Sequence, residues 1–168
     1  MAMHKDKTSI MFVCMGNICR SPTAHAVMQA LVDREGLSDQ FIIESSGTHA
    51  YHVGEPADKR AQATALTRGI NMSSLRAQKI AITDYDKFDW ILAMDEDNLE
   101  LIEYYAPEDH QAQCRLLMSF SSQNSLKRPH EMIVPDPYYG GEQGFEDVFD
   151  MVDDACKGLL NHILKGKN

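Results

Sequence analysis

Two reactive side chains, Cys14 and Arg20, stand at the two ends of the segment Cys-Met-Gly-Asn-Ile-Cys-Arg. A cysteine near a helix N-terminus or a fixed cation is held as the nucleophilic thiolate. Arg20 keeps its charge, and its planar fork matches two oxygens of a phosphate. Gly16 and Asn17 tolerate unusual backbone angles, so a short loop can turn its N–H groups inward. The spacing therefore indicates attack of Cys14 on a phosphorus atom whose oxygens are held by Arg20 and loop amides.

The segments on either side of this loop determine where its ends point. Residues 10–13 are a short apolar run with β-branched and aromatic side chains, which predicts a buried strand. Ser21 is suited to cap a helix, and Pro22 to the first helical position. A strand, a tight loop and a helix N-terminus make an anion site, because free N–H groups and the helix dipole face the loop. We also expect the Ser21 hydroxyl, next to the loop, to stabilise the thiolate.

A simpler interpretation is a buried, inert cysteine after a strand and an arginine on the surface. That interpretation suits an isolated Cys and Arg at this spacing. Here the pair belongs to a strand–loop–helix frame with a glycine and an asparagine inside the loop, so the sequence favours the chemical interpretation.

The rest of the chain alternates short apolar runs with amphipathic segments. Four strands are predicted, at residues 10–13, 41–45, 90–93 and 114–118, and four helices, at residues 21–35, 56–68, 95–105 and 145–164. This alternation predicts an α/β fold of three layers, a four-stranded parallel sheet with helices on both faces. Ligands of such sheets bind at the carboxyl ends of the strands, which is where Cys14 lies. The length suits a single domain over residues 1–168.

Composition narrows the function classes. The net charge of −9 argues against nucleic acid, whose phosphates would be repelled, and requires any phosphate site to be locally positive. No apolar run is long enough to span a membrane, and the first nine residues do not form a signal peptide, so we expect a cytoplasmic protein without membrane contacts. The four cysteines and scattered histidines show no metal-ligand spacing, and no metal or other cofactor is expected.

The segment of residues 14–22 resembles the signature of the low-molecular-weight protein tyrosine phosphatases. Residues 45–54, 88–95 and 136–139 are similar to further segments of that family, in the family's order. The resemblance thus extends over nearly the whole chain. It implies hydrolysis of phosphotyrosine in proteins through a cysteinyl-phosphate, without a metal. It also implies a tyrosine-phosphorylated protein as substrate and inorganic phosphate or other oxyanions as inhibitors.

Asp136 is the candidate general acid. A leaving alkoxide or phenoxide needs a proton, and general acids contribute about 10²–10⁴ in rate. By its residues alone, a Pro-Asp-Pro turn is slightly more typical of a solvated aspartate than of a catalytic one. The resemblance implies that Asp136 protonates the tyrosyl oxygen and then activates water against the phosphocysteine.

The expected substrate-binding residues come from the loop and from three aromatic positions. The resemblance implies that Tyr51 is an aromatic wall for the substrate ring, where the family often has Trp. The full set is Met15, Gly16, Asn17, Ile18, Cys19, Ser21, Tyr51, Tyr138 and Tyr139. The resemblance also implies a redox role for Cys19, which would capture oxidised Cys14 as a disulfide.

The sequence departs from the family in the polar connection of residues 71–78. Leu75 stands where the family has a histidine that helps to order the loop asparagine, and Gln78 stands where it has an arginine. The support of Asn17 must then come from elsewhere, and we expect Ser45 and other partners of the loop to supply it.

Three other functions compete with the leading one. Arsenate reduction, which related folds perform, needs relay cysteines close together, whereas Cys114 and Cys156 are far apart in the sequence. A protein-arginine phosphatase commonly has Thr at the position of Ile18, so the bulkier Ile18 favours tyrosine. A phosphotyrosine-binding module without turnover is disfavoured by the intact Cys14, Arg20 and Asp136.

Asp95 and Asp97 could be mistaken for a pair of metal ligands. We interpret them as residues that cap the helix predicted to begin there.

Overall fold

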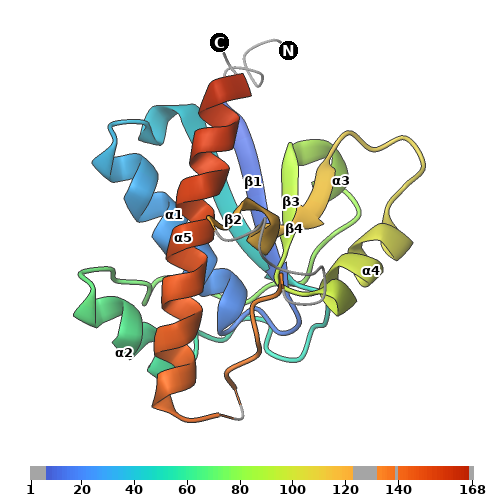
Figure 1. The fold of residues 1–168 in the computed structure, drawn as a ribbon. Helices are drawn as coiled ribbons and strands as arrows, with labels where there is room; N and C mark the ends of the chain where they lie inside the picture. The colour runs from blue at the N-terminus through green and yellow to red at the C-terminus, as the bar shows by residue number, and fades with distance from the viewer. Residues whose placement is uncertain (1–6, 123–131, 139, 167–168) are drawn as a thin grey trace.

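The computed structural model describes residues 7–122, 132–138 and 140–166. At its centre lies a four-stranded, all-parallel sheet in the order β2-β1-β3-β4 (Figure 1). Its strands are β1 (Thr8–Cys14), β2 (Phe41–Gly47), β3 (Trp90–Ala93) and β4 (Gln113–Leu116). The predicted parallel α/β architecture is confirmed. β1 is flanked on both sides and ends at Cys14, so the nucleophile candidate lies at the carboxyl edge of the sheet.

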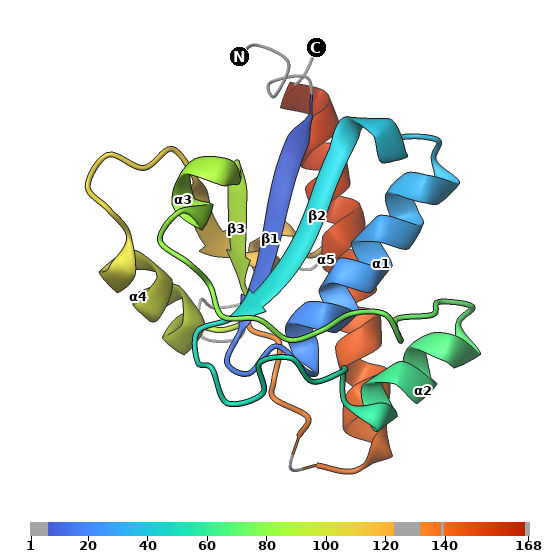
Figure 2. The same ribbon diagram turned by 180° about the vertical axis from the view of Figure 1, so that it is seen from behind.

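Helices cover both faces of the sheet, as Figures 1 and 2 show from opposite sides. One face carries the larger core, to which alternate β1 residues such as Ile10 and Phe12 contribute, and the other carries a smaller core with Met11 and Val13. Because β1 is buried on both faces, its sequence is a continuous apolar run rather than an alternation. The helices are α1 (Arg20–Arg34), α2 (Lys59–Thr67) and α5 (Glu142–Gly166) on the first face, with α3 (Asp84–Lys87) and α4 (Glu96–Tyr105) on the second.

The last helix, predicted at residues 145–164, carries an apolar stripe at helical spacing. Its members are buried in the larger core, at Phe145, Val148, Phe149, Val152, Cys156, Leu159, Leu160 and Ile163. α5 packs against α1 and, with its first turns, against α2. The last helix therefore closes the larger core over α1 and α2.

Several boundaries differ from the prediction for local reasons. α2 starts at Lys59 rather than at residue 56, because the Asp58 carboxylate accepts a hydrogen bond from the Arg60 N–H and so caps the helix. β4 stops at Leu116 and continues as a 3₁₀ turn, Leu117–Phe120. The short helix α3 and the 3₁₀ turn Ser38–Gln40 were not predicted, because such short elements carry little periodic signal. The polar sequence of residues 119–129 predicts an irregular segment, and residues 123–129 of it lie outside the described residues.

Candidate functional site

The loop between β1 and α1 wraps around the sulfur of Cys14. Asn17 has φ = 58°, a left-handed conformation that Asn tolerates better than most residues. Its backbone N–H donates to Cys14 Sγ at 3.3 Å, and the Cys14 side chain is buried. The sulfur thus lies at the start of a helix, with at least one N–H group of the loop turned towards it.

Ser21 lies behind the sulfur and does not cap the helix. α1 begins at Arg20, with Cys19 at the N-cap position and no side-chain capping bond, so the predicted capping role of Ser21 is wrong. Its fully buried Oγ lies 3.0 Å from Cys14 Sγ and 3.2 Å from the Ser46 carbonyl. The hydroxyl proton can therefore be donated to the sulfur or to that carbonyl, which suits a group that stabilises a thiolate.

Asn17 is held from two sides without the family's histidine. Its Oδ1 accepts from the Gln78 backbone N–H at 2.9 Å, and its Nδ2 donates to Ser21 Oγ at 2.7 Å. The Gln78 side chain donates to the Ser45 carbonyl at 2.8 Å. The Ser45 hydroxyl is paired with His25 at 3.0 Å instead. The direct support of Asn17 therefore comes from the Gln78 backbone, and Ser45 contributes through its carbonyl, which holds the Gln78 side chain.

His25 makes the stability of this network depend on pH. Burial lowers the pKa of His25 to about 4, whereas an unfolded histidine titrates near 6.5. The unfolded chain then binds the proton more tightly, so stability present above about pH 6.5 is lost as the pH falls towards 4. We expect the free energy of unfolding to fall by at most about 3 kcal/mol over this range through His25. The free energy of unfolding, measured with urea at pH 7 and pH 4.5, should fall less in His25→Gln than in the parent protein. An identical fall in both proteins would contradict this assignment.

Neighbouring segments pin the loop by backbone hydrogen bonds. Thr48 N–H donates to the Cys14 carbonyl at 2.9 Å, and Asp58 N–H donates to the Ile18 carbonyl at 2.8 Å. Gly47 fits at this contact only because it lacks a side chain: a Cβ there would lie 2.6 Å from the Met15 carbonyl oxygen. Gly47 lies in one of the segments that resemble the family, residues 45–54. Only the tertiary structure shows how closely it approaches the loop.

Arg20 is buried and already partly paired. One guanidinium nitrogen donates to Asp95 Oδ2 at 2.5 Å and to the Val134 carbonyl at 3.2 Å. Burial acts against its charge, but Cys14 and Asp95 outweigh burial and raise the pKa of Arg20. Asp95 also caps α4 by accepting from the Asn98 N–H at 2.8 Å. The capping prediction for Asp95 is confirmed, but the sequence did not reveal its second contact, which orients Arg20.

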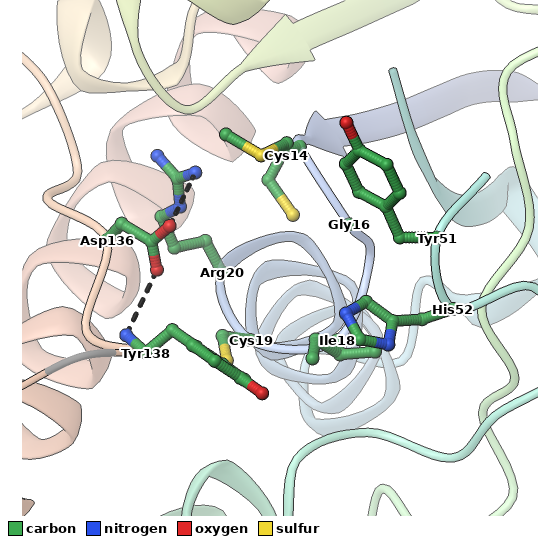
Figure 3. Close-up of a pocket in the computed structure, with 10 residues that line it drawn as sticks. Cys14, Gly16, Ile18, Cys19, Arg20, Tyr51, His52, Asp136 and Tyr138 are labelled. Carbon is green, nitrogen blue, oxygen red and sulfur yellow. Dashed lines mark hydrogen bonds and ion pairs between the residues drawn. The ribbon is translucent and has the colours of Figure 1, made fainter. Parts of the chain in front are cut away.

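Asp136 also lies close to the Arg20 guanidinium, but it comes from the segment that precedes α5. The segment of residues 134–138 is tied to the sheet by the Val134 N–H, which donates to the Met94 carbonyl at 2.7 Å. One Asp136 oxygen accepts from the Tyr138 N–H at 3.0 Å, and the other lies 3.7 Å from Arg20 (Figure 3). Its side chain is 40% exposed. A carboxyl group in this position can exchange protons with solvent and with a bound leaving group.

These groups line one cavity of about 390 Å³, large enough for an aryl phosphate (Figure 3). Its lining is Cys14, Met15, Gly16, Ile18, Cys19, Arg20, Tyr51, His52, Asp136 and Tyr138. Two predicted substrate-binding residues, Asn17 and Ser21, are not part of this lining, because their side chains pair with each other behind the sulfur. Tyr139 lies outside the described residues.

The mouth of the cavity is aromatic. Tyr51 is 69% exposed and stacks on His49, with ring centroids 5.1 Å apart. His52 was not predicted; its ring packs over Gly16 and faces Tyr138 at 6.5 Å. The segment of residues 45–54 resembles the family in the sequence, but only the structure shows that the His52 side chain also lines the cavity.

The other thiols differ in their surroundings. Burial, with the nearby charges of Asp58 and Cys14, raises the pKa of Cys19, and the thiols of Cys14 and Cys19 are both free. The disulfide between them stays a prediction, which peptide mapping after peroxide treatment tests. Cys114 and Cys156 are not in the cavity lining and belong to opposite faces of the sheet. Among the described residues, no three His, Cys, Asp or Glu side chains gather as a metal site requires.

A thiol, a guanidinium and a carboxylate that meet at the carboxyl edge of a parallel sheet are typical of phosphatases with a cysteine nucleophile. Residues 9–168 match the family described as low molecular weight phosphotyrosine protein phosphatase. The proteins of that name from Rattus norvegicus and Homo sapiens are 40% and 38% identical over 154 residues, 90% of this chain and 93% of each relative. This chain belongs to the low molecular weight phosphotyrosine protein phosphatase family.

Solved structures agree with that assignment. A protein tyrosine phosphatase from Entamoeba histolytica has a TM-score of 0.87 at 37% identity, covering 96% of this chain and 100% of that one. A Drosophila arginine phosphatase has a TM-score of 0.83 at 30% identity, covering 92% and 96%. In the part of the chain that the structure describes, no helix has the length and apolar character needed to cross a bilayer.

Proposed function

We propose that this protein hydrolyses phosphotyrosine in proteins through a cysteinyl-phosphate. The observation that carries the proposal is the convergence of Cys14, Arg20 and Asp136 on one cavity from two segments that are more than a hundred residues apart. Each group has a partner that keeps it in place: Asn17 N–H for the sulfur, Asp95 for the guanidinium and Tyr138 N–H for the carboxyl group.

In the first step the Cys14 thiolate attacks phosphorus in line with the bond to the tyrosyl oxygen. The S–P bond forms, the P–O bond breaks, and Asp136 gives its proton to the departing phenol oxygen. The loop N–H groups and Arg20 bind the three equatorial oxygens as charge develops on them. Arg20 can turn from Asp136 to the phosphate, because the 3.7 Å ion pair between them is longer than a hydrogen bond.

In the second step water replaces the sulfur. The Asp136 carboxylate takes a proton from the water as its oxygen attacks phosphorus, the S–P bond breaks, and inorganic phosphate leaves. Ser21 Oγ, 3.0 Å from Cys14 Sγ, stabilises the sulfur as it regains its negative charge. Both steps use the same anion site, so phosphate and other oxyanions are expected to inhibit.

The cavity walls favour an aromatic ester. Tyr51 and Tyr138 rise on different sides of the mouth, where a phenyl ring can pack between them (Figure 3). Ile18 contributes an apolar surface to the lining. Phosphoarginine in proteins is the second candidate, because a Drosophila arginine phosphatase shares the fold at 30% identity. We favour tyrosine because Ile18 offers no hydroxyl to a guanidinium.

Hydrolysis assays test this function. The purified protein should hydrolyse p-nitrophenyl phosphate in the presence of EDTA, and vanadate should inhibit it competitively, because the site binds oxyanions without a metal. Tyrosine-phosphorylated peptides should be hydrolysed at least about tenfold faster than matched phosphoarginine peptides. The loss of one apolar contact with a substrate lowers kcat/KM by about this factor. The reverse order would make phosphoarginine the substrate, and binding without turnover would leave only a phosphotyrosine-binding module.

Arsenate reduction gains no support from the geometry. The route needs relay thiols near the nucleophile, whereas Cys114 is half-buried on β4 and Cys156 is fully buried in α5. Cys19 does line the cavity and is the thiol that we propose reacts with a Cys14 sulfenic acid formed by peroxide. That condensation forms the S–S bond and releases water.

A further inference from the structure

Arg60, in the first turn of α2, makes contacts in two directions. Its Nε and one terminal nitrogen donate to the two carboxylate oxygens of Asp58, at 3.1 and 3.0 Å. The same terminal nitrogen donates to the Tyr138 carbonyl at 3.0 Å, and the other donates to the Gly140 carbonyl at 3.5 Å. Its guanidinium also lies 5.5 Å from the centroid of the Tyr138 ring and 4.6 Å from that of Phe145. The planar fork therefore joins α2 to the segment that follows Asp136.

Asp58, at the other end of this bridge, contacts the loop of residues 14–20, which carries the nucleophile Cys14. Its backbone N–H donates to the Ile18 carbonyl at 2.8 Å, and its side chain is only 12% exposed. Burial alone would raise the pKa of Asp58, but the hydrogen bonds from Arg60 outweigh burial and lower it. Asp58 is therefore a carboxylate at neutral pH and holds the guanidinium in a two-point contact.

The hydrogen bond from Arg60 to Tyr138 also affects Asp136, the candidate general acid. The Tyr138 N–H donates to Asp136 Oδ1 at 3.0 Å, while the carbonyl of the same residue accepts from Arg60. Holding that carbonyl thus limits where the N–H points and where the carboxyl group lies. The connection runs from the Ile18 carbonyl through Asp58, Arg60 and Tyr138 to Asp136.

We propose that Arg60, held by Asp58, is a positioning residue that sets the Asp136 carboxyl group at the right distance from the sulfur of Cys14. The proposal rests on the proposed function, in which Asp136 is the general acid. Arg60 is not in the lining of the cavity and touches no reacting atom, so it acts only through the residues 136–138. Loss of the bridge leaves the nucleophile and the anion site intact but lets the carboxyl group move.

Arg68, at the C-cap of α2, provides a matched control. Its guanidinium pairs with Glu146 at 2.7 Å and Asp150 at 2.8 Å, and lies 4.5 Å from the centroid of the Phe149 ring. Like Arg60, it combines carboxylate contacts with a contact to an aromatic ring of α5, but its carboxylate partners are on α5 rather than at the start of α2. It makes no contact with residues 134–138 among those described. Arg68→Ala therefore loses the same kinds of interaction without touching the acid segment.

The experiment compares esters that need a leaving-group proton with one that does not. For Arg60→Ala, kcat/KM for phenyl phosphate should fall about 10- to 100-fold, the effect of a misplaced catalytic group, while p-nitrophenyl phosphate falls much less. The inhibition constant of vanadate should stay within about twofold, because the anion site is unchanged. Arg68→Ala should lower both esters by the same small factor. Arg60→Lys keeps the charge without the fork and should resemble Arg60→Ala.

A double-mutant cycle identifies the path of the effect. If Arg60 acts through Asp136, adding Arg60→Ala to Asp136→Ala should cost nothing further with phenyl phosphate. Equal losses with both esters in Arg60→Ala and Arg60→Lys would overturn the proposal, as would a further full loss in the double variant. If Asp136→Ala itself shows no preference between esters, the acid role has failed first. If Asp136→Ala shows the preference and the folded Arg60→Lys does not, only the role of Arg60 fails.

Discussion

Replacing Cys14 by serine is expected to lower kcat for p-nitrophenyl phosphate by at least about 10³-fold, as removal of a nucleophile does in other hydrolases. A serine hydroxyl stays protonated at neutral pH and needs a base to attack phosphorus. The two groups hydrogen-bonded to the sulfur, the Ser21 hydroxyl and the Asn17 N–H, are not bases. The measurement is initial-rate hydrolysis at saturating substrate.

Anion binding should survive this change, because Arg20 and the loop N–H groups remain. Isothermal titration with inorganic phosphate or vanadate should therefore still give saturable binding to Cys14→Ser. Cys114→Ser is the matched control, since that half-buried thiol lies on β4 outside the cavity and its loss should leave turnover near the parent value. Acid quenching of the parent protein during turnover should yield a phosphate adduct on the peptide that contains Cys14. Undiminished turnover in Cys14→Ser would exclude the sulfur as nucleophile.

Replacing Asp136 by alanine should produce the second largest effect, and one that depends on the leaving group. With phenyl phosphate, kcat/KM, which covers only the steps up to loss of the leaving group, should fall by about 10²–10³, because phenolate leaves poorly without a proton. With p-nitrophenyl phosphate the loss in kcat/KM should be much smaller, because p-nitrophenolate is stable as an anion. Plotting log kcat/KM against leaving-group acidity for a series of aryl phosphates measures the difference as a steeper slope in Asp136→Ala.

The isosteric Asp136→Asn separates the proton from the packing. Its amide can accept the Tyr138 N–H as the carboxylate does at 3.0 Å, but it has no acidic proton. It should therefore share the steep slope of Asp136→Ala. Asp153→Ala on α5, which removes an exposed ion pair with Lys157, should keep the parent slope. Parallel lines for all four proteins would show that Asp136 does not deliver the proton.

Arg20 links these two predictions. Its guanidinium contacts both Asp95, at 2.5 Å, and Asp136, at 3.7 Å. A phosphate entering the cavity competes with Asp136 for one side of the fork while Asp95 holds the other. The shorter contact orients Arg20, and the longer one can be exchanged for phosphate at small cost, since a partly exposed ion pair contributes little.

The sequence alone predicted the main elements and the loop that carries Cys14 and Arg20. The apolar run of residues 10–13, the stripe of the last helix and the Cys14–Arg20 spacing are local patterns, so strand, helix and anion loop could each be predicted from a short window. The parallel sheet followed from the alternation of those elements. Asp136 was found through family resemblance, because its Pro-Asp-Pro turn is locally indistinguishable from a solvated one.

Only the tertiary structure decided which distant groups support the site. Asp95 orients Arg20 across 75 positions of sequence, and Gln78 supports Asn17 across 61. Ser21 was predicted to cap the helix because a serine followed by a proline is typical of a helix start. In the structure its buried hydroxyl instead contacts the sulfur of Cys14 and the Ser46 carbonyl. The local sequence does not distinguish Arg60 from the other charged residues of α2. Contacts of this kind depend on how helices pack on the two faces of the sheet, and that packing is set by the whole core at once rather than by any local pattern.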